Sequence, residues 1–300
     1  GDAIERAADV TAVVFDKTFG TLAEYWFRGS RLLERGPLPD FWRAMTDNDI
    51  GAWRSAQSRL AKDPSQDLTV WRAAGASWSP RDTTVQRLDE RSARVTFRGE
   101  LTAVGASCQL AYTVYGSGDV IVEASYQPGS TPRAMMPRFG TELVVAPGYD
   151  RITWYGRGPA PAYIDRDFER IGVYESTVAR EWNEYAKPQE NSNKVDVRWV
   201  ALTNRDGAGL LAVGSPVLGA SAYHYSKDQI EAADYSFKLV ARPQVYLNLD
   251  LKQMGVGGVD SWSQNAFPLP AYRIPSGQPY SFRYRLTPII GDFEAKAREA

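Results

Sequence analysis

Apolar and polar residues alternate at every second position along most of this chain. The stretches "ARVTFRGELTAV", "VYLNLDLKQ" and "YSFRYRL" show the pattern, and the spacing of apolar residues typical of helices is nearly absent. Successive side chains of a β-strand point to opposite faces of a sheet, so this period predicts strands with one buried face. Gly-Ser-Gly, Arg-Asp-Gly and Pro-Ser-Gly steps separate the strands and favour turns. The chain is therefore predicted to be all-β.

The amount of predicted strand also constrains the architecture. Strands that follow one another over about 290 residues are too many for one flat sheet, so we expect two large twisted antiparallel sheets packed face to face. No internal repeat or Pro/Ser-rich linker divides the chain, which favours one domain. Two segments depart from the pattern: "GAWRSAQSRLAKD" (51–63) fits a helical turn or an irregular loop, and "FEAKAREA" (293–300) fits a terminal helix or a frayed tail.

The charge balance argues against several classes of partner. The sequence has 35 basic and 36 acidic residues, a formal net charge of -1, so no broad field favours nucleic acid or an anionic membrane. No apolar run approaches the roughly 20 residues that cross a bilayer. Gly1 resembles a cloning remnant, and the chain is predicted to be a piece excised from a longer polypeptide. The sequence does not indicate a compartment, since its single cysteine, Cys108, is predicted to be a small buried hydrophobe.

The sequence argues against most classes of catalytic site. His224 is the only histidine, so neither a metal site with several histidines nor a Ser-His-Asp triad is expected. The glycine-rich "GVGGVD" lacks the lysine and the following helix of a phosphate-binding loop. Carboxylates are plentiful, and a glycosidase pair about 5–10 Å apart stays open because sequence spacing does not show distances in space.

The stretch "MGVGGVDSWS" (254–263) places three glycines in four positions and then a tryptophan, Trp262. A core strand does not tolerate this glycine density, because glycine gives up the most backbone entropy on folding and offers nothing to pack. A large aromatic ring on such a loop has two explanations: a binding platform, or a structural plug packed under the turn.

Five motifs in order identify a family resemblance. They are "FWRAMTDNDIG" (41–51), "WYGRGPAPAYIDR" (154–166), "YAKPQENSNKVDVRWVALTNRDGAGLLAVG" (185–214), "SAYHYSKDQIEAA" (221–233) and "LNLDLKQMGVGGVDSWS" (247–263). Together they resemble the C-terminal small-chain domain of family 2 β-galactosidases, the bacterial lactose-hydrolysing type. The resemblance assigns residues 10–290 to that domain, 1–9 to a remnant or linker, and 291–300 to a tail.

The resemblance implies a galactose-mutarotase-like β-supersandwich, in agreement with the strand pattern. It also implies that both catalytic glutamates of a retaining mechanism lie in a TIM-barrel portion, on the same chain or on a separate subunit, and that this chain alone is inactive. The expected partners are that barrel, a β-galactoside and further subunits of an oligomer. Magnesium and sodium are associated with the complete enzymes, and no cofactor or metal is expected on this chain.

The family's small domain completes the wall of the active site, and its "GGDDSW"-like loop supplies an aromatic platform for the outer sugar. Trp262 matches that tryptophan, and Asp260 and Ser261 beside it are the accompanying substrate-binding candidates. In this chain Val259 takes the first of the two acidic positions, so the substrate preference can differ from lactose.

A mobile loop is the second role implied by the resemblance. Gly51 matches the glycine that begins a mobile loop beside the family's active site. Gly51, Ala52, Trp53 and Arg54 are therefore lid candidates, with Gly51 as the hinge. A solvent-exposed helix or connector is the alternative.

The segment before this glycine has a local logic of its own. The side chains of Asp47, Asn48 and Asp49 can bond to nearby backbone amides and hold a turn, which makes them architectural first and sugar contacts second.

A further motif departs from the family pattern "GPxENYxDR". Its Glu-Asn pair is replaced here by Pro161-Ala162, so whatever those polar groups anchor is absent. Asp165 and Arg166 remain, and a buried Asp-Arg pair that holds the loop is the expected arrangement.

Two other classes of function stay open as alternatives. Aldose mutarotases, whose fold the family resembles, use a histidine and a glutamate for acid/base work, and His224 is the only candidate here. A stand-alone carbohydrate-binding module would need a concave pocket of its own with several convergent polar groups.

Overall fold

A computed structural model describes residues 11–60 and 67–291. The first sheet region contains β1 (Thr11–Asp16), β2 (Thr21–Phe27), β3 (Ser30–Asp40), β8 (Arg138–Val145) and β13 (Val245–Gln253). The second contains β4 (Trp78–Arg87), β5 (Ser92–Leu101), β6 (Ala106–Tyr115), β7 (Val120–Gln127) and β14 (Tyr280–Ile289). The remaining strands are β9 (Arg151–Gly158), β10 (Arg170–Thr177), β11 (Lys194–Thr203) and β12 (Gly209–Tyr223).

The helices are short apart from the first. They are α1 (Asp47–Leu60), α2 (Val70–Ala74), α3 (Val178–Glu181), α4 (Lys227–Ala232) and the 3₁₀ turns η2 (Ser236–Lys238), η3 (Gln264–Ala266) and η4 (Pro270–Tyr272). Within the described ranges, no helix has the length and apolar character that a membrane crossing requires.

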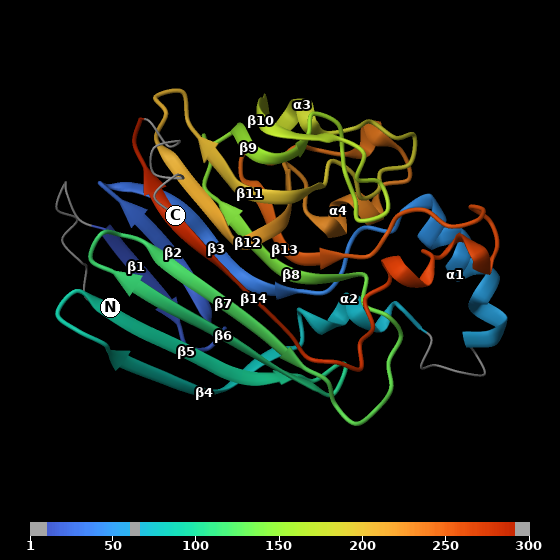
Figure 1. Cartoon of the computed structure of the whole chain (residues 1–300), viewed down its shortest axis with the longest axis horizontal. Helices are drawn as coiled ribbons and strands as arrows, with labels where there is room; N and C mark the ends of the chain where they lie inside the picture. Colours follow the sequence, from blue (N-terminus) through green and yellow to red (C-terminus); the bar gives the residue numbers. More distant parts are fainter. Residues whose placement is uncertain (1–10, 61–66, 292–300) are drawn as a thin grey trace.

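Strand β12 connects the two regions. Along one edge, residues 209–215 pair with β14 and residues 219–223 pair with β13, while β11 runs along the other edge. Pro216 lacks an N–H group to donate to a neighbouring strand, and it lies where the pairing changes from β14 to β13. The strand order β1-β2-β3-β8-β13-β12-β14-β7-β6-β5-β4 is therefore continuous, and its two halves diverge from β12 (Figure 1).

The two halves face each other across the main hydrophobic core. The rings of Phe15 in β1 and Tyr112 in β6 have centroids 5.1 Å apart. Nearer the other end, Tyr126 in β7 and Phe139 in β8 are 6.2 Å apart. The predicted all-β fold of two large antiparallel sheets is confirmed, with the addition that β12 joins them by hydrogen bonds. Cys108 lies buried in this core, as predicted, and burial raises the pKa of its thiol to about 12.

Helix α1 covers one end of the sandwich (Figure 1). The sequence left a helical turn or a loop open for residues 51–63, and the structure shows that the helix begins four residues earlier, at Asp47. The remnant predicted for residues 1–9 and all but the first residue of the tail predicted for residues 291–300 lie outside the described residues, and the domain boundaries stay predictions.

Candidate functional site

The first turn of α1 is closed by a reciprocal pair of hydrogen bonds. The Asp49 N–H donates to Thr46 Oγ1 at 3.2 Å, and the Thr46 N–H donates to Asp49 Oδ2 at 3.0 Å. This Thr-x-x-Asp spacing is a capping box, which satisfies two backbone donors that a helix start leaves free. Asp47 bonds outward instead, since its Oδ2 accepts from Gln189 Nε2 at 3.0 Å. Asp49 therefore holds the turn, and Asp47 ties it to Gln189.

Arg43 ties this turn to the start of the glycine-rich loop. Its guanidinium, which is fully buried, donates to both oxygens of Asp49 at 3.0 and 2.9 Å. It also donates to Gln253 Oε1 at 3.0 Å and to the carbonyls of Met254 and Gly255 at 2.7 and 2.9 Å. Burial lowers the pKa of Arg43, but the carboxylate of Asp49 outweighs it, and the pKa lies above its ordinary value.

The turn that carries Trp262 is organised by one carboxylate. Asp260 Oδ1 accepts from the N–H groups of Trp262 at 3.1 Å and Ser263 at 2.8 Å, and Oδ2 accepts from Ser263 Oγ at 2.6 Å. The Ser263 hydroxyl and these N–H groups lower the pKa of the Asp260 carboxyl. Asp260 thus bonds to its own turn, whereas the Trp262 side chain is 76% exposed. This exposure excludes the alternative of a plug packed under the loop.

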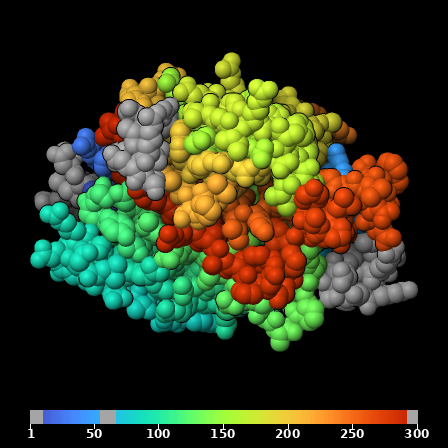
Figure 2. All heavy atoms as spheres, viewed as in Figure 1, coloured from blue at the N-terminus to red at the C-terminus, as the bar shows by residue number. Residues whose placement is uncertain are grey.

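Helix α1 and the Trp262 turn are in close contact. A Cβ at Gly51 would lie 2.0 Å from the carbonyl oxygen of Ser261 and 3.1 Å from the Cα of Trp262, so only glycine fits here. Asn48 Nδ2 donates to the Asp260 carbonyl at 3.2 Å. Figure 2 shows the orange-red segment after β13 at the surface, at the end of the molecule where Figure 1 places α1.

The lid candidates are part of this contact. Gly51, Ala52, Trp53 and Arg54 lie in α1 and are helical, with Ala52 buried and Arg54 exposed. The close approach of Gly51 to the Ser261 backbone gives this glycine a packing role. Motion of the segment about Gly51 stays a prediction.

The 159–166 loop contacts the glycine-rich loop through Asp165, and the Asp165-Arg166 pair that the sequence predicted is absent from the described part of the chain. Asp165 Oδ2 accepts from the Gly257 N–H at 2.8 Å, and so holds the glycine-rich loop. Arg166 is exposed, and no ion pair joins these two described residues. The expected buried Asp-Arg pair is therefore wrong: Asp165 binds a backbone amide that the neighbouring glycines leave accessible.

The two departures from the family pattern differ in exposure. Ala162, which follows Pro161, is fully buried, and its N–H donates to the Asn193 carbonyl at 2.8 Å. Val259 is 76% exposed on the Trp262 loop. The change at Ala162 therefore lies inside the protein, whereas the change at Val259 lies on the surface of the candidate site.

A buried charge network beneath the site was missed by the sequence analysis. Arg138, fully buried at the start of β8, lies 3.0 Å from Asp40 Oδ2, 3.1 Å from Asp250 Oδ2 and 3.5 Å from Glu190 Oε1. It also donates to Asn248 Oδ1 at 3.1 Å. All four partners are buried, which joins β3, β8, β13 and the 182–193 segment around one guanidinium.

Asp250 makes the stability of the fold depend on pH. Burial, opposed in part by Arg138, raises the pKa of Asp250 to about 8, above the unfolded value of about 3.9. The protonated Asp250 carboxyl group therefore stabilises the folded protein. This contribution to the free energy of unfolding is complete below the unfolded pKa and is lost as the pH rises toward 8, with a slope of up to about 1.4 kcal/mol per pH unit.

Asp250→Asn keeps the shape of the side chain and removes its titration, so the free energy of unfolding of the variant should fall less steeply between pH 5 and 8. Urea unfolding at pH 5, 6.5 and 8 measures this, and parallel profiles for the two proteins would contradict it.

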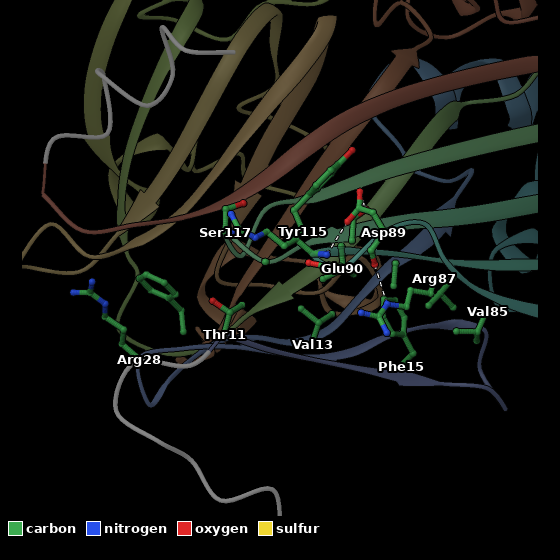
Figure 3. Close-up of a pocket in the computed structure, with 17 residues that line it drawn as sticks. Thr11, Val13, Phe15, Arg28, Val85, Arg87, Asp89, Glu90, Tyr115 and Ser117 are labelled. Atoms are coloured by element: carbon green, nitrogen blue, oxygen red, sulfur yellow. Dashed lines mark hydrogen bonds between the residues drawn. The ribbon is translucent and has the colours of Figure 1, made fainter.

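A groove of about 1100 Å³ opens at the opposite end of the molecule from α1. Figure 3 shows Val13 and Phe15 of β1 facing β4 and β5 across it, with Arg87 and Asp89 on the far side. None of the site residues predicted from the sequence lines it. The groove is therefore separate from the surface that α1 and Trp262 form.

The remaining predicted groups do not join this surface. His224 is half-buried, and its Nδ1 lies 3.0 Å from the carbonyl oxygen of Gln244. The described residues contain no group of three or more His, Cys, Asp or Glu side chains placed to hold a metal ion, and no step is assigned to a metal here.

Comparisons with known proteins agree with the motifs. The β-galactosidase of Priestia megaterium is 34% identical over 277 residues, which cover 92% of this chain and 25% of that protein. The β-galactosidase of Lactobacillus delbrueckii subsp. bulgaricus is 31% identical over 264 residues, 85% of this chain and 24% of that protein. The chain thus spans about a quarter of the length of these curated relatives.

One solved structure aligns with this chain at low sequence identity. A GalM/aldose epimerase homologue from C. elegans aligns with 94% of this chain and 99% of its own, with a TM-score of 0.45 and 9% identity. The sequence model of the family described as "Beta galactosidase small chain" matches residues 7–286. The resemblance inferred from the motifs is confirmed, and the chain belongs to the β-galactosidase small chain family.

Proposed function

We propose that this chain is the non-catalytic domain that completes the active site of a longer β-galactosidase. Family membership supports this, as does the length of the related β-galactosidases, of which the chain spans about a quarter. The catalytic glutamates of a retaining mechanism lie in the remaining part, on the same polypeptide or on a partner subunit. The chain alone does not hydrolyse β-galactosides.

The observation that carries the proposal is the exposed ring of Trp262 on a turn that is otherwise fixed. The C–H face of a pyranose packs on an indole while its hydroxyls stay free for hydrogen bonds. Trp262 stacks on the outer sugar, and the hydroxyl of the exposed residue Ser261 beside it bonds with that sugar. Asp260 supports sugar binding indirectly by holding the turn that carries Trp262, because its carboxylate accepts hydrogen bonds from Trp262 and Ser263.

Truncating the ring tests this role in the complete enzyme. Trp262→Ala should raise KM for lactose roughly 5- to 30-fold, the equivalent of about 1–2 kcal/mol for a lost aromatic contact. It should also favour water over sugar acceptors in transfer, and leave the melting temperature unchanged. Steady-state kinetics and the ratio of hydrolysis to transglycosylation measure this.

Phe237→Ala is the matched control, because Phe237 is an aromatic residue 80% exposed on η2. An unchanged KM and transfer ratio in Trp262→Ala would remove the role of the ring. Hydrolysis of a chromogenic β-galactoside by the isolated chain would instead place a catalytic carboxylate pair on these 300 residues.

A further inference from the structure

Asn48, the second residue of α1, joins this helix to both ends of the Trp262 turn. Its Nδ2 lies 3.2 Å from the carbonyl oxygen of Asp260, just before Trp262, and 3.4 Å from that of Ala266, just after it. One half-buried amide group therefore donates to the two carbonyls that bracket the turn. Both bonds are made to backbone, so they fix the path of the loop.

The backbone next to Asn48 is also held in place. The next residue, Asp49, is held by the buried guanidinium of Arg43, which also binds the carbonyls of Met254 and Gly255 at the start of the same loop. The loop is thus tied to α1 at its start by Arg43 and around its tip by Asn48. These ties hold the backbone from which the exposed indole projects, and the N–H of Trp262 is itself bound within the turn.

We propose that Asn48 is a positioning residue for Trp262, which orients the ring toward the outer sugar through the carbonyls of Asp260 and Ala266. This inference rests on the proposed function of Trp262. It assigns Asn48 an effect on binding without contact with the substrate, because both protons of its amide can be used within the protein.

A double-mutant cycle in the complete enzyme tests whether Asn48 acts through Trp262. Asn48→Ala should raise KM for lactose roughly 3- to 10-fold, as expected for lost hydrogen bonds, with kcat nearly unchanged. In the Trp262→Ala background the same change should alter KM less than about twofold, because the ring that it orients is gone.

The direction of the KM change in the isosteric variant Asn48→Asp gives an independent test of the positioning role. A carboxylate cannot donate and would face two carbonyl oxygens, so KM should rise more than in Asn48→Ala. A residue that only starts a helix would show the opposite, because a negative charge in the first turn is favourable. Asp228→Ala changes the second residue of α4, which is exposed, and should leave KM unchanged.

The outcomes separate this inference from the function on which it rests. If the effects of Asn48→Ala and Trp262→Ala on KM multiply, Asn48 does not act through the ring, and the inference is overturned alone. An unchanged or lower KM in Asn48→Asp, with a higher melting temperature, overturns it too. If Trp262→Ala has no effect, the platform itself fails.

Discussion

Replacing Arg138 with methionine is expected to lower the free energy of unfolding by about 3–5 kcal/mol, the usual cost of removing one partner from a buried ion network. Asp40, Asp250 and Glu190 are all within 3.5 Å of the guanidinium and buried. Methionine fills much of the space but leaves Asp250 and Glu190 without the Arg138 guanidinium, whereas Asp40 keeps Lys227 Nζ at 2.6 Å. Urea unfolding at pH 7 measures the loss.

The pH dependence of this variant identifies the cause. Arg138 lowers the pKa values of Asp40 and Asp250. Without it both carboxyl groups have higher pKa values in the folded state, so folding takes up protons, and the variant should regain stability as the pH falls from 8 to 5. Arg98→Met is the matched control, because Arg98 pairs with Asp82 at the surface, where it is 56% exposed. It should cost less than about 1 kcal/mol. Equal losses for the two variants would mean that the buried network contributes nothing beyond a surface pair.

The sequence did not predict this network, for a physical reason. In "VYLNLDLKQ" the alternation places Asn248 and Asp250 on the face opposite the leucines, which is normally the solvent face of an antiparallel sheet. In the structure both faces of β13 are buried over residues 245–250. Alternation thus located the strand correctly. It did not show that polar groups from three other segments meet around Arg138, since those contacts join residues far apart in sequence.

The start of α1 carried a signal that the sequence analysis did not use. Thr46 and Asp49 have the spacing of a capping box, and their hydrogen bonds place the helix start at Asp47. Gly51, a poor helix former, obscured this. The family motifs located Gly51 and Trp262 separately, and only the structure shows that the two segments touch.

Gly51→Ala is expected to destabilise the protein by about 1–3 kcal/mol, the usual range for a side chain forced into a packed contact. The new Cβ would lie 2.0 Å from the Ser261 carbonyl oxygen, a backbone atom that cannot rotate away. Helix α1 and the Trp262 turn must then separate, which strains the Asn48 bonds as well. In the complete enzyme, KM for lactose should rise together with the loss of stability.

The sign of this effect decides between two roles for Gly51. Alanine in a helix interior is favoured over glycine by roughly 0.5–1 kcal/mol, so a glycine that is only part of a helix or a hinge would give a more stable variant. Gly277→Ala is the control, since a Cβ there meets no atom within 4 Å. Thermal unfolding of both variants measures the difference. A higher melting temperature for Gly51→Ala, with an unchanged KM, would show that α1 and the loop do not need this contact, and Gly51 would then be free to serve as a hinge.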